Sequence, residues 1–137
     1  MKKWMSFVLT FICALTLCSC GWISQTDFAD MIGEDVTKID ITYHIGSSTT
    51  CWSVEGADID LLREWLNNLD YQYRYFFEGR TPGDSDGGIV YEFVLTGVEQ
   101  TRFCYVISGE NDCYLLSGEN WFPVSNPTDP PVSVPTK

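Results

Sequence analysis

The sequence predicts an α+β domain built on a single antiparallel β-sheet, with one helix packed on one face. Two observations support this prediction. Several segments alternate between apolar and polar residues, as half-buried strands do, and short stretches rich in glycine, serine and asparagine separate them. Only one segment has the apolar spacing of a convincing helix. A chain of 137 residues has room for one domain of this kind.

Composition and patterning divide the chain into four expected regions. They are an apolar leader, a short tether, the α+β domain and a proline-rich tail. In that order, they span residues 1–19, 20–36, 37–125 and 126–137. Within the tether, Thr26 can cap one helical turn over residues 27–32. The tail holds four of the six prolines and has no apolar period, so we expect it to be loose and extended.

The domain is expected to begin with a β-hairpin and a helix. Residues 38–45 alternate strictly, and the turn residues 46–48 lead to a second strand over 49–54. A helix is expected over residues 58–69. Its apolar residues fall at helical spacing and form one stripe: Ile59, Leu62, Trp65, Leu66 and Leu69. This stripe is the surface that would pack on the sheet.

A meander of four or five further antiparallel strands is expected to follow. Alternation predicts strands over 71–77, 89–95 and 101–107 and a closing strand over 121–124. The seven residues from Tyr105 to Asn111 recur, with small changes, from Tyr114 to Asn120, which predicts two consecutive hairpins. Pro123 has no backbone N–H, so the closing strand should lie at an edge or end early.

The charge and the missing motifs exclude several functions. The formal charge is −11, and a nucleic-acid binder needs a basic surface, so no nucleic-acid partner is expected. The single histidine, His44, lies on the polar side of its strand, and no hydrolase or metalloprotease motif occurs. We therefore expect no catalytic residues, no cofactor and a non-enzymatic protein. A hydrolytic enzyme is the least favoured alternative.

The N-terminus has the pattern of an export signal. Lys2 and Lys3 precede an apolar run from Trp4 to Leu17, which is too short for a membrane-spanning helix. The run leads into Leu17-Cys18-Ser19-Cys20-Gly21. This motif resembles the lipobox of bacterial prolipoproteins, which has a leucine three residues before the modified cysteine and a small residue directly before it. The resemblance covers about the first 21 residues.

The lipobox resemblance implies a lipid anchor. Cys20 would receive a diacylglyceryl group carrying acyl chains such as palmitate, and would become the first residue of the mature protein. The resemblance implies an extracytoplasmic lipoprotein held on the bilayer through acylated Cys20, in a Gram-positive rather than a Gram-negative bacterium. In layout alone, the remaining chain resembles small surface lipoproteins of Gram-positive bacteria. The alternative is an ordinary signal peptide that is cut elsewhere.

Three cysteines remain for the domain: Cys51, Cys104 and Cys113. Their spacing matches no zinc-ligand pattern, so no metal site is expected. An exported protein can form disulfides. A two-residue turn at Glu110-Asn111 would place Cys104 and Cys113 on the sheet face away from the helix, as diagonal neighbours. A Cys104–Cys113 disulfide is therefore one candidate pairing, and the connectivity of the three thiols stays open.

An aromatic row is the candidate partner-binding surface. Tyr71, Tyr73, Tyr75 and Phe77 alternate along one face of the expected strand. They either pack on the helix or form an exposed surface for a protein, peptide or glycan, with the glycine-rich loop 79–88 as its rim. Exposure of the tyrosines distinguishes the two. The expected function is a membrane-anchored interaction module; the alternative is a ligand-binding or inhibitory protein that uses the row and the loop.

Overall fold

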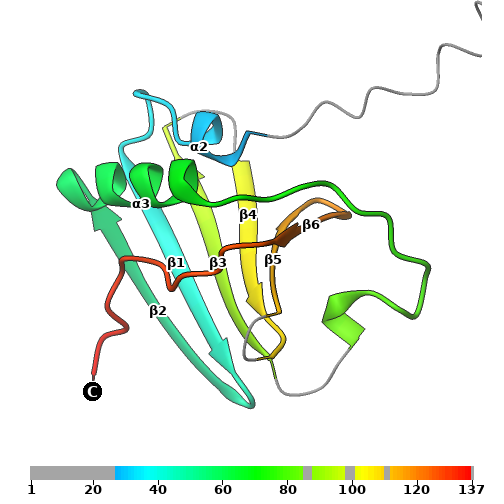
Figure 1. Cartoon of the computed structure of the whole chain (residues 1–137). Coiled ribbons are helices and arrows are strands. Elements are labelled where there is room, and N and C mark those ends of the chain that lie inside the picture. Colours follow the sequence, from blue (N-terminus) through cyan, green and yellow to red (C-terminus); the bar gives the residue numbers. More distant parts are fainter. Residues whose placement is uncertain (1–26, 85–87, 98–100, 110–111, 137) are drawn as a thin grey trace, which may run out of the picture.

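The computed structural model describes residues 27–84, 88–97, 101–109 and 112–136, so the leader and the lipobox lie outside the described residues. The elements in chain order are α2 (Phe28–Met31), β1 (Lys38–Ile45), β2 (Ser48–Glu55), α3 (Ala57–Asn68), a 3₁₀ turn (Pro82–Asp84), β3 (Ile89–Thr96), β4 (Thr101–Ile107), β5 (Cys113–Ser117) and β6 (Asn120–Val124). The described strands form one antiparallel sheet in the order β2-β1-β3-β4-β5-β6, and α2 and α3 lie on one face of it (Figure 1). This arrangement confirms the predicted α+β class with a single antiparallel sheet.

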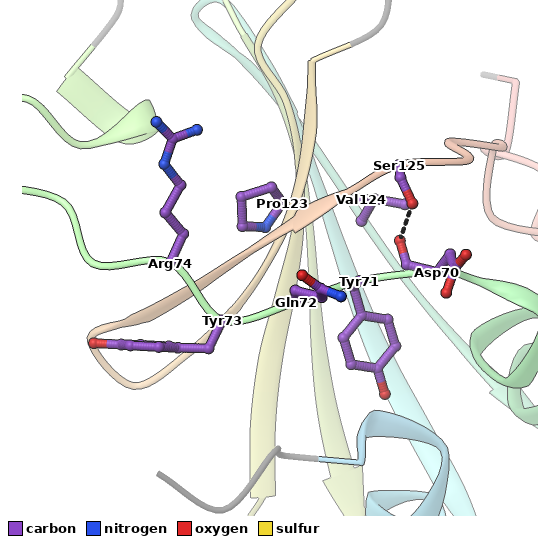
Figure 2. Close-up of a pocket in the computed structure, with 8 residues that line it drawn as sticks. All are labelled: Asp70, Tyr71, Gln72, Tyr73, Arg74, Pro123, Val124 and Ser125. Carbon is purple, nitrogen blue, oxygen red and sulfur yellow. Dashed lines mark hydrogen bonds between the residues drawn. The ribbon is translucent and has the colours of Figure 1, made fainter. Parts of the chain in front are cut away.

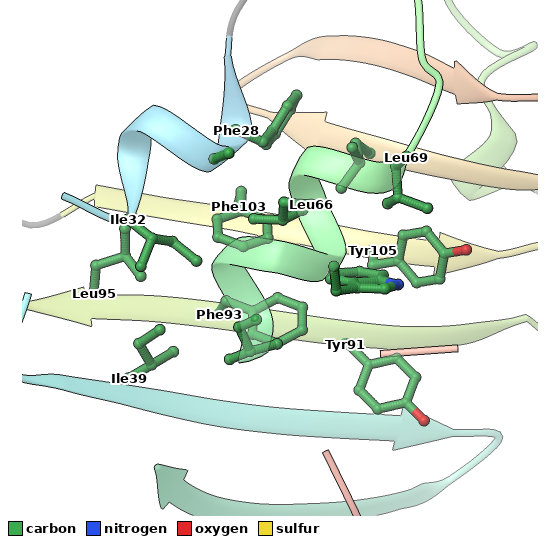
Figure 3. Packing of buried hydrophobic residues seen from close by; sticks show 14 of the residues in the cluster. Phe28, Ile32, Ile39, Leu66, Leu69, Tyr91, Phe93, Leu95, Phe103 and Tyr105 are labelled. Atoms are coloured by element: carbon green, nitrogen blue, oxygen red, sulfur yellow. The ribbon is translucent and has the colours of Figure 1, made fainter. Parts of the chain in front are cut away.

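The core lies between the sheet and the helical layer. Strand register aligns the inward side chains of neighbouring strands, with Ile41 opposite Phe93 and Phe93 opposite Phe103. The Phe93 and Phe103 rings stack with their centres 4.8 Å apart (Figure 3). Such cross-strand pairs are a main source of stability in a sheet with one covered face. The largest fully buried side chains include Tyr105, Phe28, Phe93, Phe103 and Phe122.

Helix α3 covers the centre of the sheet. Its buried residues are Ile59, Leu62, Trp65 and Leu66, which belong to the predicted apolar stripe. The Trp65 ring lies 5.0 Å from the ring of Tyr105 and 6.4 Å from that of Phe93. Asp58 and Asp60 occupy the first turn, where carboxylates interact favourably with the helix dipole. The stripe therefore holds α3 over β3 and β4.

The short helix α2 is part of the core. A carboxylate oxygen of Asp27 accepts hydrogen bonds from the N–H groups of Ala29 and Asp30, at 3.0 and 3.4 Å, and so caps the helix. Phe28 is fully buried. Arg63 of α3 donates to the carbonyl of Ile32 at 2.7 Å and joins the two helices. Residues 28–36, predicted as tether, therefore include a segment that packs on the domain.

The C-terminal tail is packed as well, so the prediction of a loose tail is wrong. Thr128 accepts hydrogen bonds from Trp65 Nε1–H at its Oγ1 and from the Tyr105 hydroxyl at its carbonyl, both at 3.0 Å. Val132 and Val134 are half-buried against the core. In Figure 1 the tail crosses the helix-bearing side of the sheet below α3. An extended strap needs only a few apolar side chains to dock, and periodicity over a short proline-rich stretch does not reveal them.

The connection between β4 and β5 is longer than predicted. Ile107 lies opposite Cys113, so residues 108–112 join the two strands. The second copy of the repeat instead forms a two-residue turn at Gly118-Glu119. The β4–β5 register therefore differs by one residue from the prediction, and a shift of one residue moves each side chain to the opposite face.

Candidate functional site

Residues 71–77, here called the aromatic segment, run alongside β6 without forming a regular strand. Its backbone makes isolated antiparallel bridges to β6. Gln72 N–H donates to the Pro123 carbonyl at 3.3 Å, and Arg74 N–H donates to the Trp121 carbonyl at 3.0 Å. Pro123 has no N–H with which to return a bond, so the ladder is interrupted there. The prediction of a strand over 71–77 is therefore wrong, because Pro123 in the neighbouring strand β6 cannot complete the ladder.

The first two tyrosines of the segment are half-buried and pack against the core. The ring centre of Tyr71 lies 5.3 Å from that of Phe28, and its hydroxyl accepts a hydrogen bond from Phe28 N–H at 3.0 Å. The Tyr73 ring lies 5.8 Å from the Phe122 ring, edge to face. Burial raises the pKa of Tyr71 above its ordinary value, so its hydroxyl stays neutral at physiological pH. For Tyr71 and Tyr73, the structure favours the core interpretation.

The second half of the aromatic segment is exposed. Tyr75 and Phe77 are 67% and 68% exposed, more than any other large hydrophobic residue in the described chain. Their rings lie 5.4 Å apart, nearly perpendicular. Phe76 turns to the other side, where its ring is 6.0 Å from that of Tyr114 and the Arg74 guanidinium lies 5.4 Å from its centre. For Tyr75 and Phe77, the structure favours the surface interpretation.

Two hollows flank the aromatic segment. The larger, of about 690 Å³, has walls formed by Tyr73, Tyr75, Phe76, Leu116 and Trp121, with Arg74, Glu78 and Glu119 among its polar residues. The smaller, of about 430 Å³, lies between residues 70–74 and 123–125 (Figure 2). Both volumes fall in the range of about 300–1,000 Å³ that small-ligand sites occupy. The larger hollow combines aromatic walls with charged groups.

Part of the loop 79–88 borders this surface. Thr81 lines the larger hollow, and Gly83 lies so close to Trp121 that an added Cβ would be 3.4 Å from the indole ring. Arg80 N–H donates to the Phe77 carbonyl at 3.0 Å, which ties the start of the loop to the aromatic segment. Residues 85–87 lie outside the described residues. The first half of the loop therefore adjoins the exposed aromatic pair.

Two arginines, Arg74 within the aromatic segment and Arg80 just after it, were missed by sequence reasoning. Other cations of the domain are neutralised in the ion pairs Lys38–Asp40, Arg63–Asp60 and Arg102–Glu92. Arg74 and Arg80 form no ion pair with any described residue, and both flank the exposed aromatics. Arginine and tyrosine are enriched at protein interfaces, and a guanidinium can bind a carboxylate or phosphate with two parallel hydrogen bonds. The sequence offered one signal for them, because both arginines lie within a few residues of Tyr75 and Phe77.

The proposed Cys104–Cys113 disulfide is absent. Cys51, Cys104 and Cys113 are all free. Cys113 is buried on the helix-bearing side, whereas Cys104 lies opposite Leu116 on the other face, because the β4–β5 register differs from the predicted one. Burial raises the pKa of Cys104 to about 11 and raises that of Cys113 as well. Both thiols therefore stay protonated at neutral pH and lack the thiolate character of a reactive cysteine.

The described residues offer few other groups for chemistry. Within them, no three His, Cys, Asp or Glu side chains gather closely enough to hold a metal ion. His44 shares a hydrogen bond with Thr49 across the β1–β2 hairpin, with Nδ1 and Oγ1 3.1 Å apart. In the same part of the chain, no helix is both long and apolar enough to span a bilayer. Among the described residues, the aromatic segment combines exposed rings with an adjoining hollow.

A scan against protein-family models, a search of curated proteins and a search of solved structures each found no match to this chain. No likeness to another protein therefore assigns a role to the aromatic segment or to the hollows beside it.

Proposed function

We propose that this protein is a membrane-anchored, extracytoplasmic lipoprotein whose domain is a non-enzymatic interaction module. It engages its partner through Tyr75, Phe77 and the hollow beside them. The observation that carries this proposal is the exposure of these two rings, because every other described aromatic side chain is buried or half-buried. Exposed aromatics gathered beside a hollow are typical of a recognition surface.

The anchor is supported by the N-terminal motif. The charge of Lys2 and Lys3, the length of the apolar run and the residues before Cys20 agree with a lipobox. Several acyl chains hold a protein on a bilayer stably, whereas a single chain does so only marginally. The acidic domain would be repelled by anionic headgroups and would face the solvent, which leaves the aromatic surface accessible.

The nature of the partner follows from the chemistry of the surface. Tyr75 and Phe77 offer large apolar faces, and Arg74 and Arg80 offer guanidinium groups that form no ion pair with described residues. A protein or peptide with an apolar side chain next to a carboxylate would satisfy both groups. The larger hollow favours a second candidate, a small ligand such as a glycan unit, because its volume of about 690 Å³ suits one.

The anchor is tested by replacing Cys20 with alanine. The variant should no longer incorporate labelled palmitate and should leave the membrane fraction, because the acylated side chain is gone. Cys18→Ala is the matched control, since Leu17 directly precedes Cys18 and the lipobox spacing does not fit it. That control should keep both the label and the membrane location. A Cys20→Ala protein that stays labelled and membrane-bound would show that the anchor lies elsewhere.

The aromatic surface is tested by the double replacement Tyr75→Ala and Phe77→Ala. Interface aromatics of this kind cost about 2 kcal/mol or more when truncated, so capture of the partner by crosslinking on intact cells should fall at least tenfold. The unfolding free energy should change by no more than about 0.5 kcal/mol, because both rings are exposed. Leu61→Ala, at an exposed site on α3, is the control. Equal capture by the double variant and the control would exclude the aromatic pair.

A further inference from the structure

Strand β2 is an open edge of the sheet. It ends the strand order, and its eight residues pair with β1 in one continuous register without a bulge (Figure 1). The opposite edge, β6, is bordered by the aromatic segment. No backbone group of the described residues bonds to the outer side of β2. An open strand of this kind is a template for another strand.

The hairpin geometry identifies the backbone groups that face outward. A two-residue turn at Gly46-Ser47 joins β1 to β2, with Ile45 opposite Ser48. Residues that flank such a turn exchange both of their hydrogen bonds, and hydrogen-bonded pairs then alternate along the ladder. The alternate residues direct their N–H and C=O groups to the free edge. These residues are Thr49, Cys51, Ser53 and Glu55.

This edge lacks the features that usually prevent strand pairing. Natural sheets protect an open edge with lysine, proline, a bulge or a very short strand. β2 has none of these, and Glu55 at its end is its only charged residue. From Ile45 to Val54 the chain carries no charge at all, in a protein with 19 acidic residues. The strip is therefore neutral and open along its length.

We propose that β2 pairs with β2 of a second copy of this chain, so that the two sheets form one continuous antiparallel sheet. With a net charge of −11, two copies repel each other over most of their surfaces, and a contact is favoured where both are uncharged. Two-fold pairing sets this neutral strip against itself and keeps the two Glu55 side chains at opposite ends. A basic partner would instead be attracted to the acidic faces.

Only two registers centre the contact on β2 and pair outward groups with outward groups. In one, Cys51 lies opposite Cys51 of the second copy; in the other, it lies opposite Ser53 of the second copy. The two Cys51 side chains are then direct neighbours or diagonal neighbours about 7–8 Å apart. Cys51 is exposed, and its thiol donates only a long hydrogen bond of 3.8 Å to Thr42 Oγ1. Its thiol is therefore a reporter of the contact.

The experiment treats the full-length protein, in membranes of the cells that produce it, with a bismaleimide crosslinker that spans about 8 Å. We expect a product of twice the monomer mass that disappears in Cys51→Ser and persists in Cys104→Ser, whose thiol is half-buried. A Cys51-dependent product of a different mass would mean that another protein occupies the edge, and would overturn the proposal. Absence of any Cys51-dependent product would overturn it as well.

A charge variant tests the pairing itself while leaving Cys51 in place. Thr49→Glu puts a carboxylate directly or diagonally opposite Glu55 of the second copy in both registers, and like charges across strands are destabilising. The crosslinked product should fall at least tenfold. Thr49→Gln has the same size without the charge and should retain it. Residue 49 is exposed, so both variants should melt alike. Equal crosslinking of the two variants would contradict the proposed strand pairing.

Discussion

Replacing Phe28 with alanine should lower the free energy of unfolding by about 3–5 kcal/mol. Phe28 is fully buried, and its ring meets the rings of Tyr71, Phe103 and Phe122 edge to face, at 5.3, 5.7 and 5.1 Å. One side chain thereby joins α2, the aromatic segment, β4 and β6. Alanine would leave a cavity among rigid rings, which cannot collapse to fill it.

Urea denaturation of the purified protein measures this loss. Phe77→Ala is the matched control, because it removes the same atoms from a side chain that is 68% exposed. The control should change the unfolding free energy by no more than about 0.5 kcal/mol. If Phe28→Ala were as mild as Phe77→Ala, then α2 would not be part of the folded core.

Docking of α2 also limits how far the domain can lie from the membrane under the proposed anchor. Only residues 21–26 separate Cys20 from Asp27, the residue that caps α2. Such a stretch spans at most about 25 Å when fully extended, at roughly 3.5 Å per residue. An acidic domain held this close would be oriented by repulsion from anionic lipids, within a few Debye lengths of the surface. Under the proposed anchor, the packing of α2 would therefore help to orient the domain at the membrane.

The spacing of apolar residues correctly predicted the elements whose pairing and packing in the fold agree with that spacing. The alternation over residues 38–45 coincides with β1, and the apolar stripe over 58–69 coincides with α3 to within one residue. The same alternation over 71–77 misleads, because pairing there depends on Pro123, about fifty residues away in the chain. Sequence periodicity reports which side chains can share a face. It does not report whether the neighbouring strand can complete the ladder.

The candidate site was anticipated only in part. The four aromatic residues stood out, yet the structure separates Tyr71 and Tyr73, which are half-buried against the core, from Tyr75 and Phe77, which are exposed. Alternation could not predict this division. The last bridge to β6 joins Arg74 to Trp121, and β6 begins at Asn120, so Phe77 lies beyond the end of the strand that the segment follows. The face that Cys113 occupies depends in the same way on the length of the turn before it. The two copies of the repeat have similar residues, but the first forms a five-residue connection and the second a two-residue turn.

Gly97→Ala should be nearly as costly, with a loss of about 3 kcal/mol or more. Gly97 has a φ of +122°, a region that side chains rarely adopt, and adaptation to such a conformation costs about 1–2 kcal/mol. A Cβ would also overlap the carbonyl oxygen of Asp35 and lie 3.2 Å from Thr37 N. Both obstacles are backbone atoms that lead into β1, so relief of the overlap would displace the start of that strand.

Gly118→Ala separates the two contributions to the loss at Gly97. Gly118 has a φ of +60°, but no atom lies within 4 Å of the position of an added Cβ. Its replacement should therefore cost only the backbone strain, about 1–2 kcal/mol. The difference between the two variants in urea denaturation measures the close approach of the end of β3 to residues 35–37. Equal losses would mean that this close approach does not constrain the fold. A larger loss at Gly97 would show that close backbone packing there fixes where β1 begins. The hydrogen bond that Thr37 N–H donates to the Thr96 carbonyl, at 3.0 Å, also indicates this role.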